Sequence, residues 1–178
     1  MEWFDISLLI VIGVFGLFGL WFGFVHTVGS LLGTVLGVYL ATRYYGPVAE
    51  WLMHVTGWQE NTARVIMFII AFILINRLVG IVFWFVDKSL QIVTKMPFIS
   101  SVNHILGLLL GVVEGVITIG VILFFIEKYP LSETVTFWIQ TSTVAIYAIP
   151  IAEVLLPLIP EGLRVLETSV DFVEAKVL

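Results

Sequence analysis

The sequence has no cysteine among its 178 residues and few of the side chains that usually build a reactive site. The absence of cysteine excludes disulfides, thiolate zinc sites and cysteine nucleophiles. The three histidines, His26, His54 and His104, are scattered along the chain, so we expect neither a metal cluster nor a cofactor. Lys and Arg number only 8, and they form no basic cluster. Because phosphate binding needs concentrated basic residues, nucleic acid is not an expected partner.

Charged residues are scarce in general, whereas apolar residues are abundant. Charged residues make up 12% of the chain, against about 25% in typical soluble domains. Hydrophobic residues make up 60%, and the mean hydropathy is +1.12. This chain cannot cover itself with polar surface, so we expect most of it to be surrounded by the lipid bilayer.

Four long apolar stretches predict four membrane-spanning helices. Residues 6–45 are too long for one span, because forty helical residues extend about 60 Å, roughly twice the hydrocarbon thickness. We therefore expect a hairpin that turns at FVHTVG, residues 24–29. The acidic Glu2 and Asp5 are unlike the basic start of a signal peptide, so the first stretch is interpreted as a retained span. The four expected spans are residues 6–25, 28–45, 64–86 and 102–126.

The connections and the C-terminal region are less regular. Residues 46–62 predict an interfacial loop around Pro47, with Trp51 and Trp58 at headgroup depth, and residues 87–101 predict a polar loop. Residues 131–160 are apolar but hold three prolines, which favours an interfacial or re-entrant segment and leaves a fifth span as the alternative. From Glu161 the pattern predicts an amphipathic helix that packs on protein. The basic residues are too few to determine the membrane orientation.

The predicted fold class is thus an all-α integral membrane protein. It comprises a bundle of four transmembrane helices (1–130), a C-terminal interfacial or re-entrant segment, and an amphipathic helix (131–178).

Glycines recur at helical spacing in three of the spans. Small residues four positions apart let helix backbones approach closely, which is how helices associate in lipid. We expect the stripes to pack against one another within the chain, with a homo-oligomer or a membrane-protein partner as the alternative. The expected packing residues are Gly16, Gly19, Gly23, Gly29, Gly33, Gly37, Gly107, Gly111 and Gly115, and Gly13 and Asp5 fall on the same side of the first span.

Two charges, Arg77 and Glu114, lie deep in the predicted spans. Consecutive spans run antiparallel, so both residues fall at similar depth near the midplane, where an isolated charge costs about 3 kcal/mol. We expect an intramembrane ion pair between them, assisted by Asn76. Three roles remain open: a structural pair that sets helix register, an ion or proton path, and a polar contact to a partner subunit.

The order of elements resembles the colicin V production protein (CvpA) family of bacterial inner-membrane proteins. The resemblance rests on Asp5 in WFDISLLIVIG, on Gly23 and Ser30 in GLWFGFVHTVGSLLG, and on VNHILGLLLGVVEGVITIGVILFF. It covers roughly residues 3–126. This chain has Asn103-His104 where the family usually has Asp-Arg, and Glu114 where it often has Arg. The resemblance implies a multi-pass inner-membrane protein associated with toxin production or export and with envelope homeostasis, and it brings no catalytic residues.

The sequence is compatible with three functions. The first is a non-enzymatic membrane protein of the CvpA type, and the second is a small oligomeric transporter or channel with a polar path at Arg77 and Glu114. The third is a membrane enzyme, which lacks support because no nucleophile, base and orienting group can be assembled from the sequence. Ser30, Ser100, Ser101 and His104 are interpreted as turn and interface residues.

Overall fold

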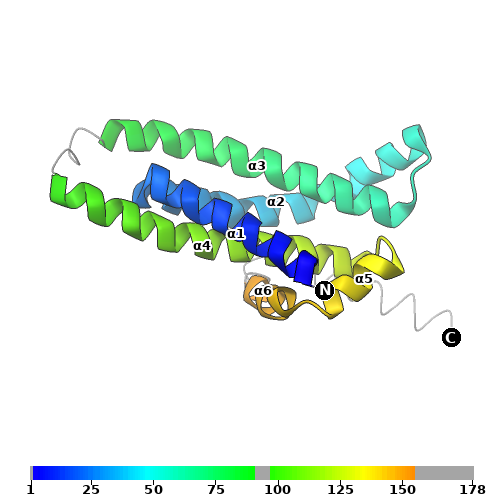
Figure 1. Cartoon of the computed structure of the whole chain (residues 1–178). Coiled ribbons are helices and arrows are strands. Elements are labelled where there is room, and N and C mark those ends of the chain that lie inside the picture. The colour runs from blue at the N-terminus through cyan, green and yellow to red at the C-terminus, as the bar shows by residue number, and fades with distance from the viewer. Residues whose placement is uncertain (1, 91–96, 155–178) are drawn as a thin grey trace.

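The structure, a computed structural model, describes residues 2–90 and 97–154, which form six helices (Figure 1). They are α1 (Glu2–Phe22), α2 (Phe24–Thr56), α3 (Glu60–Leu90), α4 (Pro97–Lys128), α5 (Glu133–Gln140) and α6 (Thr143–Glu153). Among these, α1 to α4 each contain a stretch long and apolar enough to cross a membrane. The chain is therefore an all-α, multi-pass membrane protein, as the hydropathy pattern predicts.

The four long helices pack as two pairs joined at the centre. α1 lies along α4, α3 lies along α2, and α2 and α4 pack against each other. Within the described residues, α1 and α3 form no comparable interface, so they flank α2 and α4 on the outside. Figure 1 shows α3 and α4 as long helices on opposite sides of the bundle, with the N-terminus beside α5 and α6.

A cluster of aromatic side chains joins α2, α3 and α4 towards the α5 end of the bundle. The rings of Phe68 and Phe125 stack with centroids 3.9 Å apart and planes 13° from parallel. Tyr45 meets Phe125 edge-on at 5.0 Å, and its hydroxyl lies 2.8 Å from the hydroxyl of Tyr129. The Arg64 guanidinium lies over the Tyr129 ring, 5.3 Å from its centroid. Buried aromatic surface thus holds these three helices together.

The first turn lies earlier than the sequence predicts. α1 ends at Phe22 and α2 begins at Phe24, so the whole turn is made at Gly23, which has a φ of 85°. Glycine adopts this backbone conformation readily because it has no Cβ. The polar pair His26-Thr27, taken as the turn from sequence, lies inside α2, where the Thr27 hydroxyl donates a hydrogen bond to the Gly23 carbonyl at 2.8 Å.

The predicted interfacial loop at residues 46–62 is mostly helix. α2 continues through Pro47 to Thr56, and the chain leaves the helix at Gly57, which has a φ of 68° and donates its N–H to the Met53 carbonyl. Proline removes one helical hydrogen bond, but Tyr45 and Ala49 on either side of it are buried in the core, which holds the backbone in place. Trp51 and Trp58 are exposed.

The other span boundaries also move outward. α3 begins at Glu60 and α4 at Pro97, so both are longer than the expected 64–86 and 102–126, and the predicted loop at 87–101 is helical at both ends. Residues 91–96 and the expected amphipathic helix from Glu161 lie outside the described residues.

The segment after Pro130 is a bent helix pair. α5 and α6 meet at an angle of 87°, with only Thr141 and Ser142 between them. Asp5 of α1 holds this bend: its carboxylate accepts hydrogen bonds from the Ser142 hydroxyl and from the backbone N–H groups of Thr143 and Val144, the latter two at 3.3 Å. A carboxylate at a helix N-terminus accepts hydrogen bonds from the first backbone N–H groups, for which lipid offers no acceptor.

Candidate functional site

The glycines of α1 and α4 form one close interface. A Cβ placed on Gly16 would lie 2.9 Å from Val112, and one placed on Gly19 would overlap the backbone of Gly107 and Gly111. Gly115 in turn faces Phe15 and Ile12 of α1. The two helix backbones therefore touch along this face, in the manner that small residues permit in lipid. Gly13, expected on the same stripe, is exposed and has no atom within 4 Å of its Cβ position.

The second-span glycines face a different helix. Gly33 lies against Asn76 and Val79 of α3, and Gly37 lies against Phe72, while Gly29 is buried within the same helix. The stripes of α1 and α4 thus meet each other, whereas the stripe of α2 receives side chains of α3.

Two further contacts join these helices with partners that the sequence did not specify. Gly120 of α4 lies against Ala148 and Ala152 of α6, so the bent pair has its own small-residue interface. The signal was present as alanines four residues apart in a segment that the prolines had marked as irregular. Asn103 and His104 fasten the first turn: Asn103 accepts a hydrogen bond from the Phe24 N–H at 3.2 Å, and the Leu20 carbonyl lies 2.7 Å from Nδ1 of His104.

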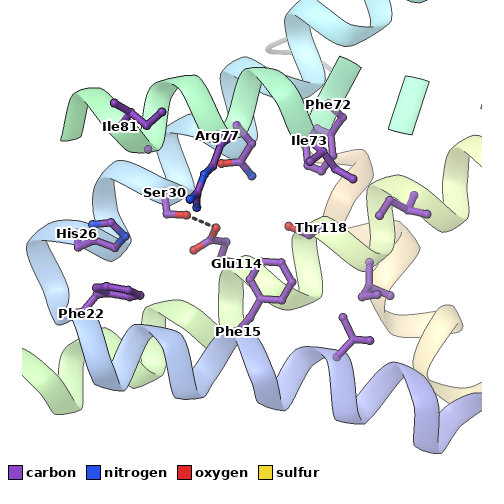
Figure 2. Close-up of a pocket in the computed structure, with 15 residues that line it drawn as sticks. Phe15, Phe22, His26, Ser30, Phe72, Ile73, Arg77, Ile81, Glu114 and Thr118 are labelled. Atoms are coloured by element: carbon purple, nitrogen blue, oxygen red, sulfur yellow. Dashed lines mark hydrogen bonds between the residues drawn. The ribbon is translucent and has the colours of Figure 1, made fainter. Parts of the chain in front are cut away.

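A cavity of about 670 Å³ occupies the space between α1 and α3, over a floor formed by α2 and α4. A second cavity of about 280 Å³ adjoins it and reaches the first turn. Figure 2 shows α3 and α1 as opposite walls, with Glu114 between them. The two cavities share six lining residues: Phe15, Phe22, His26, Ser30, Arg77 and Glu114.

Glu114 lies at the floor of this cavity and is only 4% exposed. Its Oε1 accepts a hydrogen bond from the Ser30 hydroxyl at 2.5 Å and a longer one from the Thr34 hydroxyl at 3.5 Å. Thr34 in turn accepts from the Asn76 amide at 3.1 Å, so three helices contribute to one polar network. The buried carboxylate is therefore stabilised by hydroxyl donors.

In place of the expected ion pair with Arg77, Glu114 accepts hydrogen bonds from hydroxyl groups of α2. Both side chains line the same cavity, and in Figure 2 the guanidinium of Arg77 points inward towards Ser30. Among the described residues, however, the ion pair that forms is Arg64 with Glu60, and Arg77 makes no such contact. The reason is geometric: α3 packs mainly along α2, and its ring contacts with α4 lie at the aromatic cluster around Phe68 and Phe125. At Glu114, it is the hydroxyls of α2 that lie within hydrogen-bond distance. Asn76 assists through Thr34, not directly.

Thr118, one helical turn after Glu114, also points into the cavity (Figure 2). It is 6% exposed, and its hydroxyl has no hydrogen-bond partner among the described residues.

Ser30 and Thr34 could have been found from sequence, because each directly follows a glycine of the four-residue repeat in α2. The described residues contain no group of three His, Asp or Glu side chains arranged for a metal ion. The arrangement suits recognition of a polar or charged group.

Comparison with known proteins gives the evolutionary context. A family model described as "Colicin V production protein" matches residues 4–153, which include all six described helices almost completely. The chain belongs to the colicin V production protein family. The relative in Escherichia coli, named colicin V production protein, is 29% identical over 129 residues, which cover 72% of this chain and 76% of the relative. A colicin V production protein homolog of Haemophilus influenzae is 26% identical over 124 residues, covering 68% and 71%.

No solved structure matches this chain. The match to the colicin V production protein family extends beyond the resemblance seen in sequence, which stopped near residue 126, and takes in α5 and α6. The bent pair is therefore part of what the family model describes.

Proposed function

We propose that this protein is a non-enzymatic protein of the bacterial inner membrane that supports production or export of a colicin V-type toxin and contributes to envelope homeostasis. The family match over residues 4–153 carries the proposal. The relative in Escherichia coli that shares 29% identity is named colicin V production protein, which supports the toxin-production part of the proposal.

Gene replacement in a toxin-producing strain tests the proposal. A strain lacking its own colicin V production protein should secrete less toxin and be more sensitive to detergents and bile salts. Expression of this chain should restore both properties, and expression of the Asp5→Ala variant should restore them less well because the α6 anchor is lost. Complementation of neither property, with the protein present in the membrane, would refute the proposal.

A second candidate, a small transporter or channel, is favoured by the cavity at Arg77 and Glu114. Charged residues inside membrane spans commonly mark substrate or ion paths. Reconstituted protein should then carry protons or small ions across liposomes, and Glu114→Gln should lower the flux. Glu127→Gln is the matched control, since Glu127 is exposed on the same helix. Absence of flux for protons, Na⁺, K⁺ and Cl⁻ would eliminate this candidate.

A further inference from the structure

The cavity between α1 and α3 holds two opposite charges that do not pair with each other. The carboxylate of Glu114 uses Oε1 for both of its hydrogen bonds, which leaves Oε2 without a described donor. Arg77 is exposed as a residue, and its guanidinium has no hydrogen bond or ion pair within residues 2–90 and 97–154. A cation and a carboxylate held apart at one cavity are complementary to a group that carries both charges.

The mouth of the cavity opens sideways. Val11 and Phe22 of α1 and Ile73 and Ile81 of α3 line the cavity and are also exposed on the outer surface of the bundle. Because the described parts of α1 and α3 form no close interface, this opening lies between two spans and faces the surrounding lipid. A ligand can therefore reach the two charges from the bilayer itself.

The two adjoining cavities differ in character. The smaller cavity reaches the first turn at Gly23. Ser30, which lines both cavities, lies seven residues after that turn, about 10 Å along α2. The larger one is walled mainly by apolar side chains: Val11, Phe15, Phe72, Ile73, Ile81, Ile119 and Ile122. A molecule with a charged head and an apolar chain fits both parts, with its head where the cavities join.

We propose that this cavity binds a zwitterionic phospholipid, with the head group between Arg77 and Glu114 and an acyl chain along the apolar wall of the larger cavity. The guanidinium donates to the phosphate, Oε2 of Glu114 accepts from the ammonium group, and the unpartnered Thr118 hydroxyl supplies a further hydrogen bond. A purely anionic head would face the Glu114 carboxylate, and a purely cationic head would face the guanidinium. The volume of about 670 Å³ lies within the range of ligand pockets, about 300–1,000 Å³.

Binding of single-chain lipids to the purified full-length protein in a non-ionic detergent tests this proposal by native mass spectrometry and calorimetry. Lysophosphatidylethanolamine should bind about tenfold or more tightly than lysophosphatidylglycerol, because only the former satisfies both charges. Arg77→Gln should weaken both lipids about tenfold, whereas Glu114→Gln should abolish the preference between them. Arg43→Gln and Glu127→Gln, which alter exposed charges outside the cavity, should leave binding unchanged.

A pair of glycine variants tests the same site without removing a charge. A Cβ on Gly80, which lines the cavity, would meet no atom within 4 Å, and the same holds for Gly13 outside it. Gly80→Leu should fill the cavity and lower lipid binding about tenfold, while Gly13→Leu should bind as the unaltered protein does. The comparison of Gly80→Leu with Gly13→Leu still tests the lipid site if a charge variant does not fold.

Three results would overturn the proposal. The first is equal affinity for the two lysolipids, and the second is unaltered binding by Gly80→Leu. The third is binding of chain-free phosphoethanolamine as tight as that of the lysolipid, which would assign the site to a soluble zwitterion. None of these outcomes depends on toxin secretion, so the lipid site and the proposed cellular role fail or stand separately.

Discussion

Replacement of Asp5 by alanine should loosen α6 without unfolding the bundle. The Asp5 carboxylate accepts three hydrogen bonds at the start of α6, from the Ser142 hydroxyl and from the N–H groups of Thr143 and Val144. Loss of a capping acceptor costs about 0.5–2 kcal/mol, and loss of a negative charge at a helix N-terminus costs about 0.3–1 kcal/mol. We therefore expect local opening of α6 to become easier by about 1–3 kcal/mol, or roughly 5- to 150-fold.

Hydrogen exchange measured by mass spectrometry on the purified protein reports this opening directly. Peptides that cover residues 143–153 should exchange roughly 5- to 150-fold faster in Asp5→Ala, whereas peptides of the α2–α3 pair should be unchanged. In Asp5→Asn, exchange of the α6 peptides should be faster than in the unaltered protein and slower than in Asp5→Ala, because the asparagine keeps an acceptor and loses the charge. Glu50→Ala, an exposed carboxylate on α2, is the matched control. Unaltered exchange of α6 in Asp5→Ala would show that packing against α4 alone holds the bent pair.

Two further substitutions examine the helix interface and the polar network. Gly19→Ala should lower the thermal unfolding temperature, because its Cβ would overlap the backbone of α4 at an overpacking cost of about 1–3 kcal/mol. Gly13→Ala is the control. Equal unfolding temperatures for the two variants would contradict the close contact between α1 and α4. Ser30→Ala should destabilise the protein by about 1–3 kcal/mol, because it removes the 2.5 Å hydrogen bond to the buried Glu114. Glu114→Gln in the Ser30→Ala background should recover part of the loss, and no recovery would argue against a role for the negative charge.

The position of the first turn illustrates how far local polarity can mislead in a membrane chain. His26 and Thr27 are the first polar residues after a long apolar run, so they mark a turn by hydropathy. In the structure the Thr27 hydroxyl is satisfied by the carbonyl four residues earlier, and a polar residue with such a bond can remain within a helix. The turn falls instead at Gly23, where the backbone requires a conformation that glycine adopts without strain.

The candidate site shows the complementary limit. Arg77, Glu114 and Asn76 were recognisable because polar groups are costly in a span, and all three lie at one polar cavity or its network. Their partners were not recognisable, because sequence depth says how far along each helix a residue lies and not which neighbouring helix it faces. Glu114 therefore pairs with hydroxyls of α2, although Arg77 lies at similar depth on α3.

Hydropathy and spacing by themselves determined the number of long spans, the all-α class and the presence of glycine faces, since each follows from the cost of placing unpaired polar groups in lipid and from the 3.6-residue helical repeat. Which glycine face meets which helix was decided only by the tertiary structure, where the backbone of α1 rests on α4 and that of α2 receives the side chains of α3. The cavity likewise exists only because α1 and α3 pack on different partners and leave a gap over Glu114. Pairing of helices is a long-range choice among similar apolar surfaces, so it depends on the fit of the whole bundle and not on any one segment.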